Sequence, residues 1–231
     1  MNLRFASLVD EDPSAYPRKR SAVLFLCGCP LKCGFCSRPE LLETASCGEE
    51  PTPFFARHFA ETKPEAVVFA GGEPLMQGNA LHELCMLLAK QQRLSIKIDT
   101  CGYYPEALAD LLPFLSYVSL DIKTRLEQEP YAEMTGFGGS PELLLSNVLR
   151  SLAFLEKLGS HVFKEFRFTV VEGKNDDAET AESVAKYVAP YCDRFLVAGA
   201  DRNKSLPLAQ AARKHVQNVA LRTPQGEEKV F

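Results

Sequence analysis

Three cysteines near the N-terminus have a spacing that suits a metal centre. The segment from Cys29 through Cys33 to Cys36 reads C-x3-C-x2-C. A loop this short can curl three thiolates inward around a compact cluster. A [4Fe–4S] cube held by three cysteines keeps one iron open to an external ligand, whereas electron-carrier cubes normally use four cysteines. The pattern therefore favours an iron–sulfur centre with one open iron.

The remaining cysteines leave a second interpretation open. A structural zinc ion would need a fourth ligand, which Cys27 or Cys47 could provide, although the chain has no second C-x2-C pair. Clustered cysteines in a chain without an export signal indicate reduced thiols rather than disulfides. We expect Cys47, Cys85, Cys101 and Cys192 to be small buried residues or bystanders. For Cys27, a role in ligand exchange or redox chemistry stays open.

Polar residues follow the predicted strands at the point where each one ends. Gly71-Gly72-Glu73-Pro74 follows one apolar run, Asp99-Thr100 ends the next, and Asp121-Ile122-Lys123 ends the third. In parallel α/β folds, chemistry gathers at the carboxyl ends of the strands. Seen alone, the first motif is an ordinary turn and the last is a solvated pair. Together with the cysteine loop, they predict a site at one rim.

The pattern of apolar residues predicts the elements that position this site. Consecutive apolar positions, typical of strands buried on both faces, recur at 22–26, 66–70, 94–100, 117–122, 165–171, 194–198 and 219–222. Helical patterns lie between them at 53–61, 79–92, 105–112, 141–158 and 177–188, and a basic helix comes late in the chain. This alternation predicts an α/β fold, a partial (β/α)6 barrel of parallel strands. We expect a single domain over residues 1–231, with a core at about 16–222.

Composition excludes several classes of function. The 231 residues are 46% hydrophobic, the net charge is −4 and the pI is about 5.7, which disfavours a nucleic-acid or anionic-membrane binder. No apolar run approaches the ~20 residues of a membrane helix. The first twelve residues carry three acids and no apolar segment, so we expect no signal peptide and a cytoplasmic protein.

The motifs, taken together, resemble the radical S-adenosylmethionine (SAM) superfamily. The aromatic Phe35 before the third cysteine, the GGEP segment and the DIK segment match that family in order and spacing over about residues 16–222. The DIK segment is similar to that of glycyl radical enzyme activating proteins. Within that group the chain most resembles activators of anaerobic ribonucleoside-triphosphate reductase.

This resemblance implies one [4Fe–4S] cluster on Cys29, Cys33 and Cys36, together with S-adenosylmethionine. Lys123 would pair with the methionine carboxylate, while Asp121 and Thr100 would accept from its ammonium group. The implied cofactor contacts are Phe35, Cys36, Ser37, Gly71, Gly72, Glu73, Thr100, Asp121, Ile122 and Lys123. Asp99 and Asp121 would also hold a monovalent cation, and Arg167 matches a strand-five arginine of the group. Residues 195–201 lack the histidine that some relatives place there.

The resemblance further implies a partner and a source of electrons. The partner would be a glycyl radical enzyme such as anaerobic ribonucleotide reductase, and the donor a flavodoxin or ferredoxin type protein. Two alternatives stay open. One is a radical SAM enzyme for a small molecule, similar to 7-carboxy-7-deazaguanine synthase. The other is a binding or electron-carrier protein with zinc or a passive cluster, which would have no use for the GGEP and DIK segments.

Overall fold

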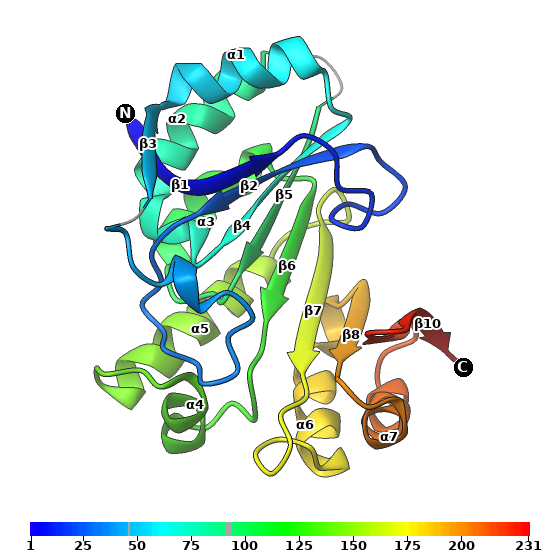
Figure 1. Cartoon of the computed structure of the whole chain (residues 1–231). Coiled ribbons are helices and arrows are strands. Elements are labelled where there is room, and N and C mark those ends of the chain that lie inside the picture. Colours follow the sequence, from blue (N-terminus) through cyan, green and yellow to red (C-terminus); the bar gives the residue numbers. More distant parts are fainter. Residues whose placement is uncertain (46, 91–93) are drawn as a thin grey trace. The chain divides into compact units, whose positions relative to one another are not determined.

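The computed structural model describes residues 1–45, 47–90 and 94–231, and these form two compact units. The first unit contains Met1–Lys32 and Cys36–Val118, and the second contains Cys33–Phe35 and Ser119–Phe231. Figure 1 traces the chain through both units, from the blue N-terminus to the red C-terminus. The boundary falls inside the cysteine motif and inside the strand that leads to Asp121.

Parallel strands form the centre of the first unit. Its strands follow the order β5-β4-β2-β1-β3, in which β4 is parallel to both β2 and β5 and β1 runs antiparallel to β2 and β3. Helices α1 and α2 lie beside each other, as do α2 and α3 (Figure 1). The elements are β1 (Asn2–Val9), β2 (Ser21–Leu26), η1 (Pro39–Leu41), β3 (Gly48–Pro51), α1 (Thr52–Thr62), β4 (Ala66–Gly71), η2 (Pro74–Gln77), α2 (Gly78–Leu88), β5 (Ser95–Thr100), α3 (Pro105–Leu111), η3 (Leu112–Phe114) and the start of β6 (Tyr117–Asp121).

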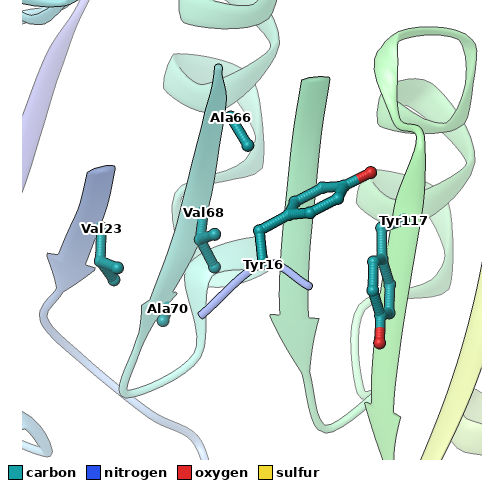
Figure 2. Packing of buried hydrophobic residues seen from close by; sticks show 6 residues of the cluster. All are labelled: Tyr16, Val23, Ala66, Val68, Ala70 and Tyr117. Carbon is teal, nitrogen blue, oxygen red and sulfur yellow. The ribbon is translucent and has the colours of Figure 1, made fainter. Parts of the chain in front are cut away.

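Both faces of β4 are buried. Its alternate residues Ala66, Val68 and Ala70 belong to a cluster in which the Tyr16 and Tyr117 rings meet edge to face, with centroids 5.4 Å apart (Figure 2). The small alanine side chains leave room for Tyr16, which lies over the sheet. The residues between them, Val67 and Phe69, are fully buried as well. A strand covered on both faces reads as a continuous apolar run, as the sequence predicts.

The second unit repeats the β/α alternation. Its strands follow the order β6-β7-β8-β9-β10; β8 is parallel to both β7 and β9, and β10 pairs antiparallel with β9. Ser140 caps α5 and Asp177 caps α6, each by accepting a backbone N–H of the first turn. The further elements are α4 (Gln128–Thr135), α5 (Pro141–Glu156), β7 (Phe163–Thr169), α6 (Ala178–Val188), η4 (Ala189–Tyr191), β8 (Arg194–Ala198), α7 (Arg202–Arg213), β9 (Val219–Thr223) and β10 (Gly226–Val230).

All seven predicted strands are confirmed, and the predicted helices match α1, α2, α3, α5, α6 and α7. The end of the predicted helix 79–92 reaches residues that lie outside the described ones. The sequence analysis missed β1, β3, β10 and α4. The single domain over residues 1–231 stays a prediction. In the described part of the chain, no helix has the length and apolar character needed to cross a membrane.

Candidate functional site

The Gly71–Glu73 segment holds the start of the cysteine loop. Gly71 has a φ of +123°, and a Cβ there would lie 2.2 Å from the carbonyl oxygen of Leu26. A Cβ on Gly72 would lie 2.3 Å from the carbonyl oxygen of Gly28. The Gly72 amide donates to Leu26 (2.9 Å) and the Glu73 amide donates to Gly28 (2.7 Å). Only glycines allow this close approach, which fixes the backbone immediately before Cys29.

Glu73 is fully buried, and its carboxylate joins the GGEP turn to the end of β5. Oε1 accepts from the Leu75 amide (3.0 Å) and the Thr100 hydroxyl (2.8 Å), while Oε2 accepts from the Cys101 amide (2.7 Å). Burial raises the pKa of Glu73, and hydrogen bonds from Cys101, Thr100 and Leu75 oppose that rise. The sequence analysis expected Glu73 among the cofactor contacts, and that contact stays a prediction. The structure shows the Glu73 carboxylate holding two loops together inside the first unit.

Replacing Glu73 by alanine should destabilise the protein because two buried amides, those of Leu75 and Cys101, lose their acceptor. A loss of about 2 kcal/mol or more is expected, which corresponds to a fall in melting temperature of roughly 5 °C. Thermal unfolding followed by circular dichroism measures it. The exposed Glu61 of α1 provides the matched control, because Glu61→Ala should change stability by less than about 0.5 kcal/mol. Equal melting temperatures for the two variants would show that the Glu73 network is dispensable.

The cysteine motif offers three thiols to a cluster. Cys29 and Cys36 are half-buried in the first unit, Cys33 is half-buried in the second, and none of them is in a disulfide. Thiolates are the ligands that iron–sulfur clusters require. The donor set of the motif therefore fits a [4Fe–4S] cube with three protein ligands.

One expectation about the cysteines is wrong. Cys27 and Cys47 form a disulfide across a separation of 20 residues. Cys47 is thus not a bystander, and neither of these sulfurs can serve as a zinc ligand while the disulfide is intact. Cysteine spacing and the lack of an export signal favoured reduced thiols, but neither shows which cysteines the fold brings within bonding distance.

The scattered cysteines behave as expected. Burial raises the pKa of Cys85 and of Cys192 to about 12, so both stay protonated near neutral pH. Burial, with the nearby charges of Glu73 and Cys29, raises the pKa of Cys101 further. A buried protonated thiol is a poor metal ligand. Cys101 nevertheless contributes through its amide, which binds Glu73.

A cationic group lies where β6 ends in the second unit. Asp121 pairs with the Lys123 ammonium (2.8 Å) and with the Arg167 guanidinium of β7. Burial favours the protonated acid, but the charges of Arg167 and Lys123 prevail and hold the pKa of Asp121 well below its usual range. The three side chains together carry a formal charge of +1. Lys123 also lies 5.8 Å from the centroid of the Phe35 ring.

Asn175 bonds to the backbone of the strand ends that carry Asp121, Lys123 and Arg167, and the sequence analysis missed it. Its side chain is fully buried; Nδ2 donates to the carbonyls of Lys123 (2.7 Å) and Thr169 (2.9 Å), and Oδ1 accepts from the Val171 amide (2.7 Å). It therefore ties the end of β6 to the end of β7. The only sequence signal was its place in a polar segment directly after a predicted strand. The buried Ile122 joins the same strands through its amide, which donates to Arg167 (2.9 Å).

Of three other predicted residues, Thr100 and Asp99 have local partners. The Thr100 hydroxyl donates to Glu73 and accepts from the Gly102 amide (3.0 Å). Asp99 pairs with Lys97 at 3.2 Å, and Ser37 is exposed. Contacts of these residues with a cofactor stay predictions. Lys97 pairs with Asp99, and Lys123 and Arg167 pair with Asp121, while the monovalent-cation site on these two acids stays a prediction.

Comparison with known proteins gives consistent matches. A family model described as the Radical SAM superfamily matches residues 23–187. The "Putative glycyl-radical enzyme activating enzyme MJ1227" of Methanocaldococcus jannaschii is 30% identical over 244 residues, covering 98% of each chain. The pyruvate formate-lyase-activating enzyme of Clostridium pasteurianum is 28% identical over 174 residues, which is 72% of this chain and 68% of that one.

A solved structure, QueE from Escherichia coli, superimposes with a TM-score of 0.65 at 16% identity, covering 96% of this chain and 95% of that one. At this level of identity the likeness concerns the fold alone. The predicted fold class is confirmed by these matches. The finer resemblance to ribonucleotide reductase activators stays a prediction.

Proposed function

The chain belongs to the radical SAM superfamily, and from this premise we propose that it installs a glycyl radical on a partner enzyme. As a member of the superfamily it uses a [4Fe–4S] cluster and S-adenosylmethionine. When bound and reduced, the cluster would supply the electron for the reductive cleavage of S-adenosylmethionine. The observation that carries the activator proposal is the similarity, over 98% of both chains, to a relative named for glycyl-radical enzyme activation.

The chain's own residues would bind and orient the cofactors. We propose that Cys29, Cys33 and Cys36 ligate the cluster, with Ser37 beside the last of them. In the second unit, Lys123 and Arg167 place two cationic groups beside Asp121, and Lys123 would pair with the methionine carboxylate. The low pKa of Asp121 keeps both cations paired and in place near neutral pH.

The other predicted contacts would act through backbone and ring atoms. Gly71 and Gly72 would present a main-chain carbonyl to the methionine ammonium, and Glu73 and Thr100 would hold that turn from behind. Phe35, whose ring lies near the Lys123 ammonium, would form an apolar wall for the adenine. Ile122 would keep Asp121 and Lys123 in register through its bond to β7.

We propose a glycyl radical enzyme such as anaerobic ribonucleotide reductase as the partner, and a cytoplasmic flavodoxin or ferredoxin type protein as the electron donor. The test uses a candidate glycyl radical enzyme from the same organism, with deuterium on its target glycine. Deuterium is expected in 5′-deoxyadenosine, while a glycyl radical signal grows in the electron paramagnetic resonance spectrum. Formation of 5′-deoxyadenosine without deuterium or a radical signal would instead favour the small-molecule alternative.

A further inference from the structure

The Cys27–Cys47 disulfide closes the segment that carries the whole cluster motif. Cys27 follows β2 directly, and Cys47 directly precedes β3. The three cluster cysteines all lie between them in the sequence. Five of the eight cysteines thus fall within one short stretch, and the disulfide removes two of them from the set of available thiols.

Cys27 is held in place by more than the disulfide. It is 1% exposed, its amide donates to the Arg4 carbonyl (3.1 Å), and its carbonyl accepts from the Gln77 side chain (3.2 Å). The next residue, Gly28, donates to the Leu41 carbonyl (2.7 Å). These backbone bonds do not depend on the sulfur. A reduced Cys27 would therefore remain two residues from Cys29 with its thiol released.

The disulfide can be reached from the surface of the first unit. Cys47 is half-buried, and Cys27 lines a cavity of about 330 Å3. Its walls include the Arg4–Glu49 ion pair. The residues lining it with Cys27 are Asn2, Arg4, Thr44, Glu49, Met76 and Gln77. This is room enough for a small thiol reagent or for a cysteine side chain presented on a loop.

We propose that Cys27 and Cys47 form a thiol–disulfide exchange site whose substrate is a dithiol, and that the oxidised pair reserves the fourth iron of the cluster for S-adenosylmethionine. The exchange is a two-electron step. One thiolate of the dithiol attacks Cys47, forms a mixed disulfide and releases the Cys27 thiolate. The second thiol of the reagent displaces Cys47, so that the reagent leaves as its own disulfide and both cysteines take up protons.

The consequence follows from the number of ligands. With the disulfide closed, the stretch offers three thiols, which leaves one iron open. With the disulfide reduced, Cys27 competes for that iron, and a cube held by four cysteines resembles an electron carrier that excludes S-adenosylmethionine. The inference rests on the proposed cluster ligation by Cys29, Cys33 and Cys36. It adds that the redox state of the neighbouring pair controls access of the cofactor.

Variants separate this role from simple stabilisation. Cys47→Ala leaves Cys27 as a permanent thiol, whereas the double variant Cys27→Ala/Cys47→Ala removes the disulfide and the competitor together. We expect both to hold a full complement of iron. Cys47→Ala should bind S-adenosylmethionine at least about tenfold more weakly than wild type, and the double variant should return to within about twofold. Equilibrium dialysis and the cofactor-induced change in the reduced cluster's paramagnetic resonance spectrum measure this.

If the single and the double variant bind S-adenosylmethionine with equal affinity, whether that affinity is weaker than or equal to that of wild type, the proposal is overturned. Only competition by Cys27 predicts that removing Cys27 restores the affinity lost in Cys47→Ala. A loss of iron from both variants would overturn it too and would make the disulfide a structural staple. Wild-type protein is purified anaerobically without thiols, freed of iron with a chelator and unfolded in denaturant, so that every free thiol can react. Alkylation should then add six labels, rising to eight when the protein is first treated with a dithiol. Eight labels from the start would also contradict it. Cofactor binding by wild type stays the separate check on the proposed function.

Discussion

Replacing Cys29, Cys33 or Cys36 by alanine is expected to remove the iron–sulfur cluster. Anaerobically reconstituted wild type should hold about four irons and four sulfides per chain, and each variant should hold less than about one iron. The cluster would have only three protein ligands, one for each of three irons. Loss of one cysteine would leave two ligands, which are too few to retain the cluster. Iron and sulfide analysis, together with the brown charge-transfer absorption, measures the effect.

Cys85→Ala and Cys192→Ala are the matched controls. Burial raises the pKa of both thiols to about 12, so neither supplies a thiolate near neutral pH. Both variants should keep the full iron content. Loss of the cluster in a control, or its retention after removal of Cys33, would show that the ligand assignment is wrong. Stoichiometric zinc in place of iron would support the zinc interpretation instead.

Replacing Lys123 by methionine is expected to weaken the binding of S-adenosylmethionine by about tenfold to a hundredfold, the usual range for loss of a charge-assisted hydrogen bond. Methionine keeps most of the volume and removes the ammonium. Asp121 retains its Arg167 partner, so the strand ends should remain in place. Equilibrium dialysis of cluster-loaded protein gives the dissociation constant, and the iron content should not change.

Lys174→Met serves as the control for this prediction, because Lys174 is exposed and lies in the loop after β7. It removes the same charge from the same unit and should leave cofactor binding within about twofold of wild type. If Lys123→Met binds S-adenosylmethionine as tightly as this control, then Lys123 is a structural partner of Asp121 and takes no part in holding the carboxylate.

Buried parallel strands were the most predictable part of the fold. In β4 and β8, consecutive apolar residues predict a strand that is buried on both faces. The missed strands β3 and β10 are polar edge strands, GEEP and GEEKV, whose residues are mostly exposed. Their pairing depends on neighbours that are distant in sequence or on a hairpin turn, and hydrophobic periodicity carries no such signal.

Motif positions in the candidate site were predictable, but the partners of those residues were not. The spacing of the three cysteines and the GGEP and DIK segments identified the superfamily before any geometry was known. The burial of Glu73, the support from Asn175 and the pairing of Cys27 with Cys47 depend on contacts across many residues of sequence. Such contacts are set by the tertiary structure, so local sequence patterns could not reveal them.

The most direct test of the account is the fate of S-adenosylmethionine in the presence of the reduced protein alone. Cluster-loaded protein is mixed anaerobically with dithionite and S-adenosylmethionine, and the products are measured by liquid chromatography with mass spectrometry. We expect 5′-deoxyadenosine and methionine in equal amounts, with none formed when the reductant is omitted. Absence of both products from protein that carries about four irons and a reduced-cluster resonance signal would contradict it.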